Sequence, residues 1–283
     1  MSKFFLVLIF LLVYSFGYSQ IEIVLGPFND RLDKYSHFNK IDSIIEYNFL
    51  AHLVKGKIIK GDEDRGRAKT TIIFNDRETV VEISDYISST KKGNTYQYKL
   101  DNQERIIERL VFNNEREIVK IIINYQNESL IEKLVYFYGE SSPRTKWSYE
   151  FDMNNMSITE NIVHPNNEVY STYEIDKNGR ELKREDNDYY RLSQYSNEGK
   201  LIEEEQYARI QIDDGRPISP IYKTIYNYDN YLNIIEIQEI RGIATTYKKY
   251  QYVFDENNNW IERIEFSNDK PILITEREIV YRK

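Results

Sequence analysis

The chain has 283 residues, 41% of them apolar and 30% charged, and a formal net charge of −8. Its length allows one large domain or two ordinary ones, and its 25 tyrosines and many β-branched residues argue against intrinsic disorder. The absence of cysteine excludes disulfide scaffolds, thiolate zinc sites, iron–sulfur clusters and cysteine nucleophiles, and an acidic balance without a long basic run argues against nucleic acid as a partner.

Residues 1–19 have the pattern of a secretory signal peptide. Lys3 supplies the positive start, an apolar run extends from Phe4 to Tyr14, and Gly17-Tyr18-Ser19 forms a small-x-small cleavage site. The alternative is a membrane anchor, but eleven apolar residues are about half of what a spanning helix needs. We therefore expect a protein that is secreted, periplasmic or held at the cell envelope. We expect no transmembrane segment after cleavage, and a mature charge of −9 because Lys3 is lost.

Residues 20–68 form an irregular N-terminal segment with two interpretations. Apolar residues from Leu32 to Phe49 recur three or four apart, which is typical of one helix face. The stretch HFNKIDSIIEY (37–47) is equally consistent with a degenerate copy of the repeat that follows, and the balance slightly favours this second interpretation.

Residues 69–283 repeat one pattern, in which an aromatic-rich strand is followed by a short turn and then by a strand that mixes Ile, Leu or Trp with charged residues. The copies recur about every 25 residues, with one place where turns come at half that distance, and such a period is typical of an array of supersecondary units. The residues that open the predicted turns are Asn75, Asp101, Asn113, Gln126, Asp152, Asp176, Ser196, Asp229 and Asp255.

The chemistry of each copy favours a β-hairpin. Tyr, Phe, Ile and Val suit strands, and an Asp or Asn side chain accepts hydrogen bonds from the backbone just ahead of it and so starts a tight turn. Strands joined by such turns are antiparallel neighbours. We predict an all-β fold, an antiparallel meander of repeated hairpins.

The two faces of the predicted strands are both mixed. In 104–112 and in 129–138, charged and apolar side chains occur on each face, whereas a sandwich strand alternates cleanly and a membrane-barrel strand keeps charge off its lipid face. This pattern favours an extended twisted or spiralling sheet. A closed or two-layer β-fold, with its periodicity blurred by bulges, is the alternative.

The copies resemble the tyrosine–aspartate (YD) repeats of RHS proteins, with the approximate pattern Y-x-Y-D-x-x-G-R-L. YEIDKNGREL (173–182) matches best, whereas YNYDNYLN (226–233) and YVFDENNNW (252–260) lack the glycine. The resemblance covers about residues 96–266 and implies an extended hairpin sheet. The chain is more similar to small secreted YD-like proteins of Bacteroidota, a family that implies no particular activity.

The sequence contains none of the common phosphate-binding, dinucleotide-binding, esterase or metalloprotease motifs, so we predict no catalytic residue, cofactor or metal. The three histidines, His37, His52 and His164, are widely spaced and favour surface positions over a metal site. The stretch 255–259 superficially resembles a calcium loop, but a turn fits it better. Glu203 and Glu205 share a strand face and are the carboxylate pair that a glycan hydrolase would need, although a charged solvated strand explains them more simply.

Aromatic residues concentrate near the C-terminus, where exposed rings would stack on sugars or anchor a protein partner, or would instead pack within the sheet. The leading hypothesis is an exported, non-enzymatic repeat protein with an acidic, Tyr-rich β-surface that binds a protein or glycan of the envelope or medium. The alternatives are a secreted glycan hydrolase and an accessory or immunity factor of a toxin system. The candidate partner-binding residues are Tyr226, Tyr228, Tyr231, Tyr250, Tyr252 and Trp260.

Overall fold

The computed structural model describes residues 41–282, apart from 78, 127–128, 153, 165–166, 177, 179, 209–211, 214–215 and 218. The described residues form antiparallel strands and contain no helix, which confirms the predicted all-β meander. The strands are β1 (Ile41–Val54), β2 (Lys57–Glu63), β3 (Lys69–Phe74), β4 (Val80–Ile87), β5 (Lys92–Leu100), β6 (Ile106–Asn113), β7 (Arg116–Gln126), β8 (Ser129–Phe137), β9 (Thr145–Asp152), β10 (Ser157–His164), β11 (Asn167–Ile175), β12 (Glu181–Glu185), β13 (Tyr189–Tyr195), β14 (Leu201–Ala208), β15 (Ile212–Asp213), β16 (Arg216–Pro217), β17 (Tyr222–Tyr228), β18 (Ile234–Arg241), β19 (Ala244–Phe254), β20 (Trp260–Ser267) and β21 (Lys270–Tyr281).

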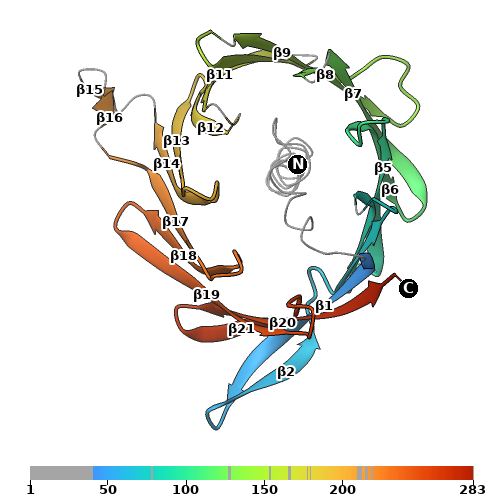
Figure 1. Cartoon of the computed structure of the whole chain (residues 1–283), viewed down its shortest axis with the longest axis vertical. Coiled ribbons are helices and arrows are strands. Elements are labelled where there is room, and N and C mark those ends of the chain that lie inside the picture. The colour runs from blue at the N-terminus through green and yellow to red at the C-terminus, as the bar shows by residue number, and fades with distance from the viewer. Residues whose placement is uncertain are drawn as a thin grey trace, which may run out of the picture.

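The meander closes on itself, because β1 pairs with β3 on one side and with the last strand, β21, on the other. The result is an 18-strand barrel made of β1, β3–β14 and β17–β21, seen as a ring in Figure 1. The expectation of an open twisted sheet is therefore wrong, and the closed alternative is the one adopted. Closure pairs every strand of the wall on both sides, which removes the sheet edges that invite aggregation.

Two small elements lie outside the ring in Figure 1. Strand β2 pairs with the second half of β1 and forms a hairpin that projects from the wall, and β15–β16 forms a small hairpin between β14 and β17. Since β1 runs from Ile41 to Val54 as a strand, the helical interpretation is wrong for that part. The residues before 41 lie outside the described part of the chain.

The turns alternate between the two ends of the barrel and differ in type at each end. At one end, which we call the hairpin end, three two-residue turns place both central residues at positive φ, as type I′ turns require: Lys55–Gly56, Asn114–Glu115 and Asn268–Asp269. Asn113 belongs to this end and does not open a turn of the repeating kind. This explains the single half-spacing in the sequence, since the turns on either side of it lie at the opposite end.

The opposite end, which we call the Asx end, carries the turns that Asp, Asn or Ser opens. In Asp101 and Asp176, one carboxylate oxygen accepts the backbone N–H groups two and four residues ahead at 2.8 and 3.0 Å, and the other binds Nε of the arginine four residues ahead. The backbone N–H of the opening residue also donates to the carbonyl four residues ahead in six of these turns. This local chemistry is what the sequence pattern predicted.

A β-bulge follows most turns at the Asx end. In seven hairpins the register slips by one residue next to the turn, for example between Lys99 and Leu100 and between Val253 and Phe254. Each slip moves the following side chains to the other face of the wall. Apolar and polar residues therefore do not alternate strictly along the sequence of a strand next to such a turn.

The two faces of the wall differ in burial. One face, here called the tyrosine face, carries Tyr98, Tyr149 and Tyr173 together with core isoleucines such as Ile44 and Ile158, all nine-tenths buried or more. The other, here called the ladder face, carries cross-strand ion pairs. We assign the tyrosine face to the inside of the ring, because side chains on the concave side of a curved wall converge and cover one another.

Candidate binding surface

The predicted partner-binding aromatics lie mostly within the wall. Tyr226, Tyr228, Tyr250 and Tyr252 are half-buried on the tyrosine face, and Trp260 is only 9% exposed. Trp260 lies 5.9 Å from the Tyr252 ring, and the guanidinium of Arg277 stacks on its face. These five residues therefore pack against the barrel itself, and Tyr231, in a turn at the Asx end, is the member of the set that is well exposed, at 62%.

Three tyrosine hydroxyls bind the backbone of the strand before their own. Tyr125 donates to the carbonyl of Ile106, Tyr228 to that of Leu201, and Tyr252 to that of Ile234. Each acceptor is the first residue of a strand that leaves a turn at the Asx end. In these three hairpins the repeated tyrosine thus has a structural role that accounts for its presence without invoking a ligand.

A buried ionic cluster surrounds Glu160 on the tyrosine face. Tyr173 donates to its carboxylate at 2.5 Å, and Arg184 lies 3.5 Å from it. Burial and the nearby carboxylate raise the pKa values of Tyr149 and Tyr173 well above the ordinary value. Burial also lowers the pKa of Lys133 to about 8. Sequence reasoning missed this cluster, because its members come from β8 to β12 and only strand register brings them together.

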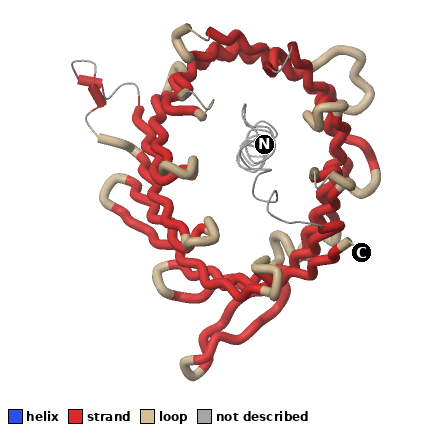
Figure 2. Tube along the Cα trace, in the orientation of Figure 1, coloured by secondary structure: helices blue, strands red, loops and turns tan. Residues whose placement is uncertain are grey.

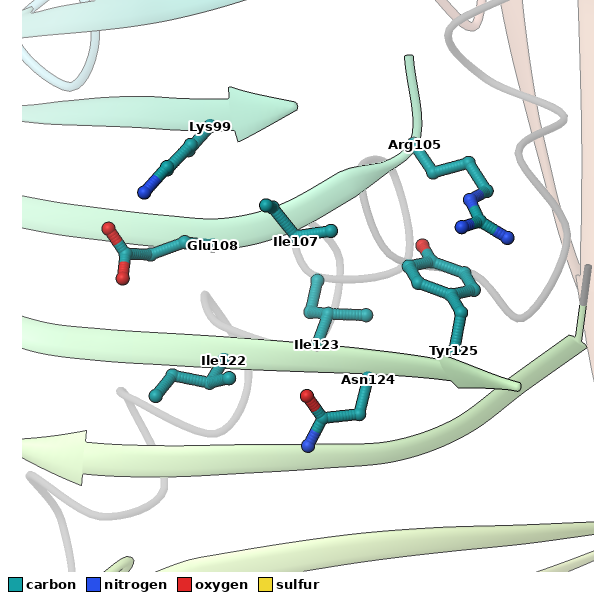
Figure 3. Close-up of a pocket in the computed structure, with 8 residues that line it drawn as sticks. All are labelled: Lys99, Arg105, Ile107, Glu108, Ile122, Ile123, Asn124 and Tyr125. Atoms are coloured by element: carbon teal, nitrogen blue, oxygen red, sulfur yellow. The ribbon is translucent and has the colours of Figure 1, made fainter. Parts of the chain in front are cut away.

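A pocket between β5, β6 and β7 is lined by side chains from both faces of the wall (Figure 3). Its lining includes one carboxylate, Glu108, which is 2.7 Å from Lys120. Arg105 stacks on the ring of Tyr125 at the other end of the pocket. A glycoside hydrolase requires two converging acids, one of them with a raised pKa, and this pocket supplies a single neutralised carboxylate.

The glutamates proposed as a hydrolytic pair are also neutralised. Glu203 and Glu205 both contact Nζ of Lys223, at 2.8 and 2.9 Å. Burial acts to raise the pKa of Glu205, but hydrogen bonds from Tyr207 and Lys223 outweigh it, and the pKa is lowered. A carboxylate that must donate a proton needs the opposite shift. The arrangement fits a solvated cross-strand ladder.

No cation site is formed by the described residues. Asp255 accepts the backbone N–H groups of Asn257 and Asn259 and the hydroxyl of Tyr281, so the calcium-like stretch is a turn. His164 is hydrogen-bonded to Thr145, while His37 lies outside the described residues. Across the described part of the chain, no three His, Asp or Glu side chains are grouped to hold a metal ion.

Exposed apolar side chains gather at the hairpin end. Of the 19 exposed large hydrophobic residues in the described chain, 13 lie in the half of the barrel nearest that end. We call this set the apolar rim, and sequence reasoning missed it because its members are spread over the whole chain. The apolar rim consists of Leu50, Leu53, Val54, Ile59, Tyr86, Phe137, Tyr138, Val163, Tyr170, Tyr189, Ile243, Tyr247 and Ile272.

Both faces of the wall carry ion pairs. On the ladder face Glu132 and Lys146 are 2.5 Å apart, and on the tyrosine face Glu46 and Arg277 are 2.6 Å apart. A charge on the lipid face of a membrane barrel costs roughly 2–4 kcal/mol near the midplane. Both faces of the wall therefore carry charged side chains in the described residues. The described residues also contain no helix of the length and apolarity needed to cross a membrane.

Comparison with known proteins finds similarity among solved structures alone. No family model and no curated protein matches the chain. Among solved structures, a porin-like protein from Bacteroides uniformis matches 85% of this chain and 98% of its own, at 9% identity and a TM-score of 0.32. The Photorhabdus luminescens Tc holotoxin pore matches 76% of this chain and 14% of its own, at 9% identity and a TM-score of 0.27. The TcdB2-TccC3-TEV structure matches 81% of this chain and 11% of its own, at 11% identity and a TM-score of 0.28. At these values the matches assign neither a family nor an activity.

Proposed function

We propose that the chain is an exported, non-enzymatic binding protein: a barrel that stands in water and engages an envelope or extracellular partner through its apolar rim. The observation that carries this proposal is the concentration of exposed apolar and aromatic side chains at one end of the barrel. We infer that part of this set forms continuous apolar surface, which is typical of interaction sites, whereas singly scattered exposed residues are not. Ile243, Leu53 and Tyr138 are the most exposed members of the rim, at 106%, 62% and 61%.

The neutralised carboxylates support the non-enzymatic part of the proposal. Glu108, Glu203 and Glu205 each contact a lysine, so none is poised to act as a general acid. The ion pairs on both faces support a barrel in water. An export signal at residues 1–19 would place such a barrel in the envelope or outside the cell.

Site-specific photo-crosslinking tests the proposal. A photoreactive amino acid at Tyr138 or Ile243, on the rim, is compared with one at Tyr231 or Val253, which are also exposed but lie at the Asx end. We expect crosslinks to one discrete partner from the rim positions alone. Equal crosslinking from both ends, or from neither, would contradict the proposal that the apolar rim binds the partner. Partition of the mature protein into detergent during phase separation would contradict a barrel in water.

A further inference from the structure

Strand β2 leaves an open edge at the apolar rim. It pairs with β1 on one side only, and no described residue pairs with its other side from Lys57 to Lys60. The hairpin projects beyond the ring in Figure 2, clear of the neighbouring strands. β2 lies outside the 18-strand wall, whose strands each pair with a neighbour on both sides, so closure of the ring does not cover this side of β2.

The turn geometry fixes which backbone groups point to the open side. A two-residue type I′ turn, Lys55–Gly56, closes on a hydrogen-bonded pair, here Val54 and Lys57. Since hydrogen-bonding direction alternates along a strand, Ile58 and Lys60 direct their N–H and C=O groups away from β1. These are the groups to which an added strand would bind.

The side chains at this edge are cationic and apolar on an otherwise acidic protein. Lys55 and Lys57 are exposed, and Leu53 and Ile59 are 62% and 44% exposed. The ammonium of Lys60 is already held by Glu276 at 2.8 Å. Asp62 and Glu63, at the base of the hairpin, reverse the charge there. A complementary strand is therefore acidic opposite the tip, apolar in the middle and not acidic near the base.

We propose that β2 binds an extended segment of a partner protein by strand addition, and that this segment carries acidic residues next to apolar ones. This inference rests on the proposed function and names the chemistry of the partner. Main-chain hydrogen bonds to Ile58 and Lys60 supply the pairing, and the lysines at the tip select acidic sequences. The register slip between Lys60 and Glu63 limits the added strand to the outer part of the hairpin.

The probe is a fluorescein-labelled peptide of sequence Thr-Val-Thr-Val-Glu-Val-Glu, titrated with the mature protein by fluorescence anisotropy. A peptide with Lys in place of Glu is the matched control. We expect at least tenfold tighter binding of the acidic peptide, weakening as salt rises from 50 to 500 mM, since exposed charges are screened. Equal binding of the two peptides, or no binding of either, would overturn the proposal.

Four variants separate the contribution of the lysine charges from that of the main-chain hydrogen bonds. K55E/K57E should reverse the charge preference, whereas K92E/K270E, which changes two exposed lysines at the same end of the barrel, should leave it intact. Ile58→Pro removes an outward N–H and should abolish binding, whereas Ile58→Ala keeps it and should bind within about threefold. If the K55E/K57E protein keeps its preference, the edge is not the site.

Two other occupants of the β2 edge, a second copy of the chain and an anionic membrane, would give different experimental results. Concentration-dependent dimerisation in sedimentation that Ile58→Pro abolishes would assign the edge to a second copy of the chain. Binding to phosphatidylglycerol vesicles that K55E/K57E abolishes would assign it to an anionic membrane. Either result would overturn the strand-addition proposal, yet rim crosslinking at Tyr138 would still report on the proposed function separately.

Discussion

Asp176→Ala tests whether the opening aspartate of each repeat holds the barrel together. The Asp176 carboxylate accepts the N–H of Asn178 at 2.8 Å and of Arg180 at 3.0 Å, and binds the Arg180 guanidinium at 2.5 Å. A hydrogen bond to a charged group contributes about 1.5–3 kcal/mol, and the value is lower where solvent reaches it. With Asp176 and Arg180 16% and 20% exposed, we expect a loss of about 3 kcal/mol in the free energy of unfolding.

Asp176→Asn separates the two contributions, because the amide oxygen still accepts the backbone N–H groups while the ion pair is lost. We expect this variant to lose about 1 kcal/mol. The measurement is urea unfolding followed by circular dichroism and tryptophan fluorescence, with Asp188→Ala, an exposed residue of a turn at the hairpin end, as the control. Equal losses for the Ala and Asn variants would show that the turn hydrogen bonds contribute nothing, which would refute this account of the repeat.

The same variant has a pH signature. Burial acts to raise the pKa of Asp176, but hydrogen bonds from Arg180 and Asn178 outweigh it and hold the pKa below the ordinary value. A lowered folded-state pKa gives stability that is present above the unfolded-state pKa and is lost as pH falls through the folded-state pKa. The wild type should therefore lose its advantage over Asp176→Asn below about pH 4. A difference that stays constant down to pH 2 would contradict the assigned cause.

Three further predictions concern the tyrosine face. Tyr228→Phe should lose about 1 kcal/mol of stability, since the bond to Leu201 is removed, and Tyr231→Phe, in the adjoining exposed turn, should lose nothing measurable in the same urea assay. Glu160→Gln should lose about 3 kcal/mol, because it leaves cationic neighbours buried without their anion, and an unchanged urea midpoint would argue against the buried cluster. Lys133 has a folded-state pKa of about 8, below its unfolded-state value, so the free energy of unfolding should rise between pH 8 and 10. Lys133→Met should abolish that rise, as measured by thermal unfolding. An unchanged dependence of stability on pH in this variant would refute the prediction.

Local structure was predictable because local chemistry determines it. The hairpins and most of their turns follow from short patterns such as the Asp101 and Asp176 turns, whose hydrogen bonds stay within five residues. The exception, Asn113, shows the limit of spacing alone: an Asn can precede a type I′ turn at one end or open an Asx turn at the other. Only the positive φ values of both Asn114 and Glu115 separate the cases.

Closure could not be predicted, because it depends on contacts between the two ends of the described chain. Ile44 pairs with Ile279 and Glu46 with Arg277, more than 230 residues apart. The sequence of one repeat unit does not determine how many units the array contains, and each unit would fit an open sheet equally well. What selects the ring is the accumulated curvature of 18 strands together with a final strand whose side chains complement those of the first.

Closure also explains why the aromatic residues lie where they do. In an open sheet Tyr228, Tyr252 and Trp260 would be available to a ligand, which is one of the two roles that the sequence left open for them; packing within the sheet is the other. In a ring their face is concave, Arg263 and Arg277 lie over the ring of Trp260, and the hydroxyls of Tyr228 and Tyr252 bind carbonyls of the strand before. The rings are thereby used to join one unit to the next. We propose that binding instead involves the apolar rim and the open edge of β2, where apolar and cationic side chains are exposed.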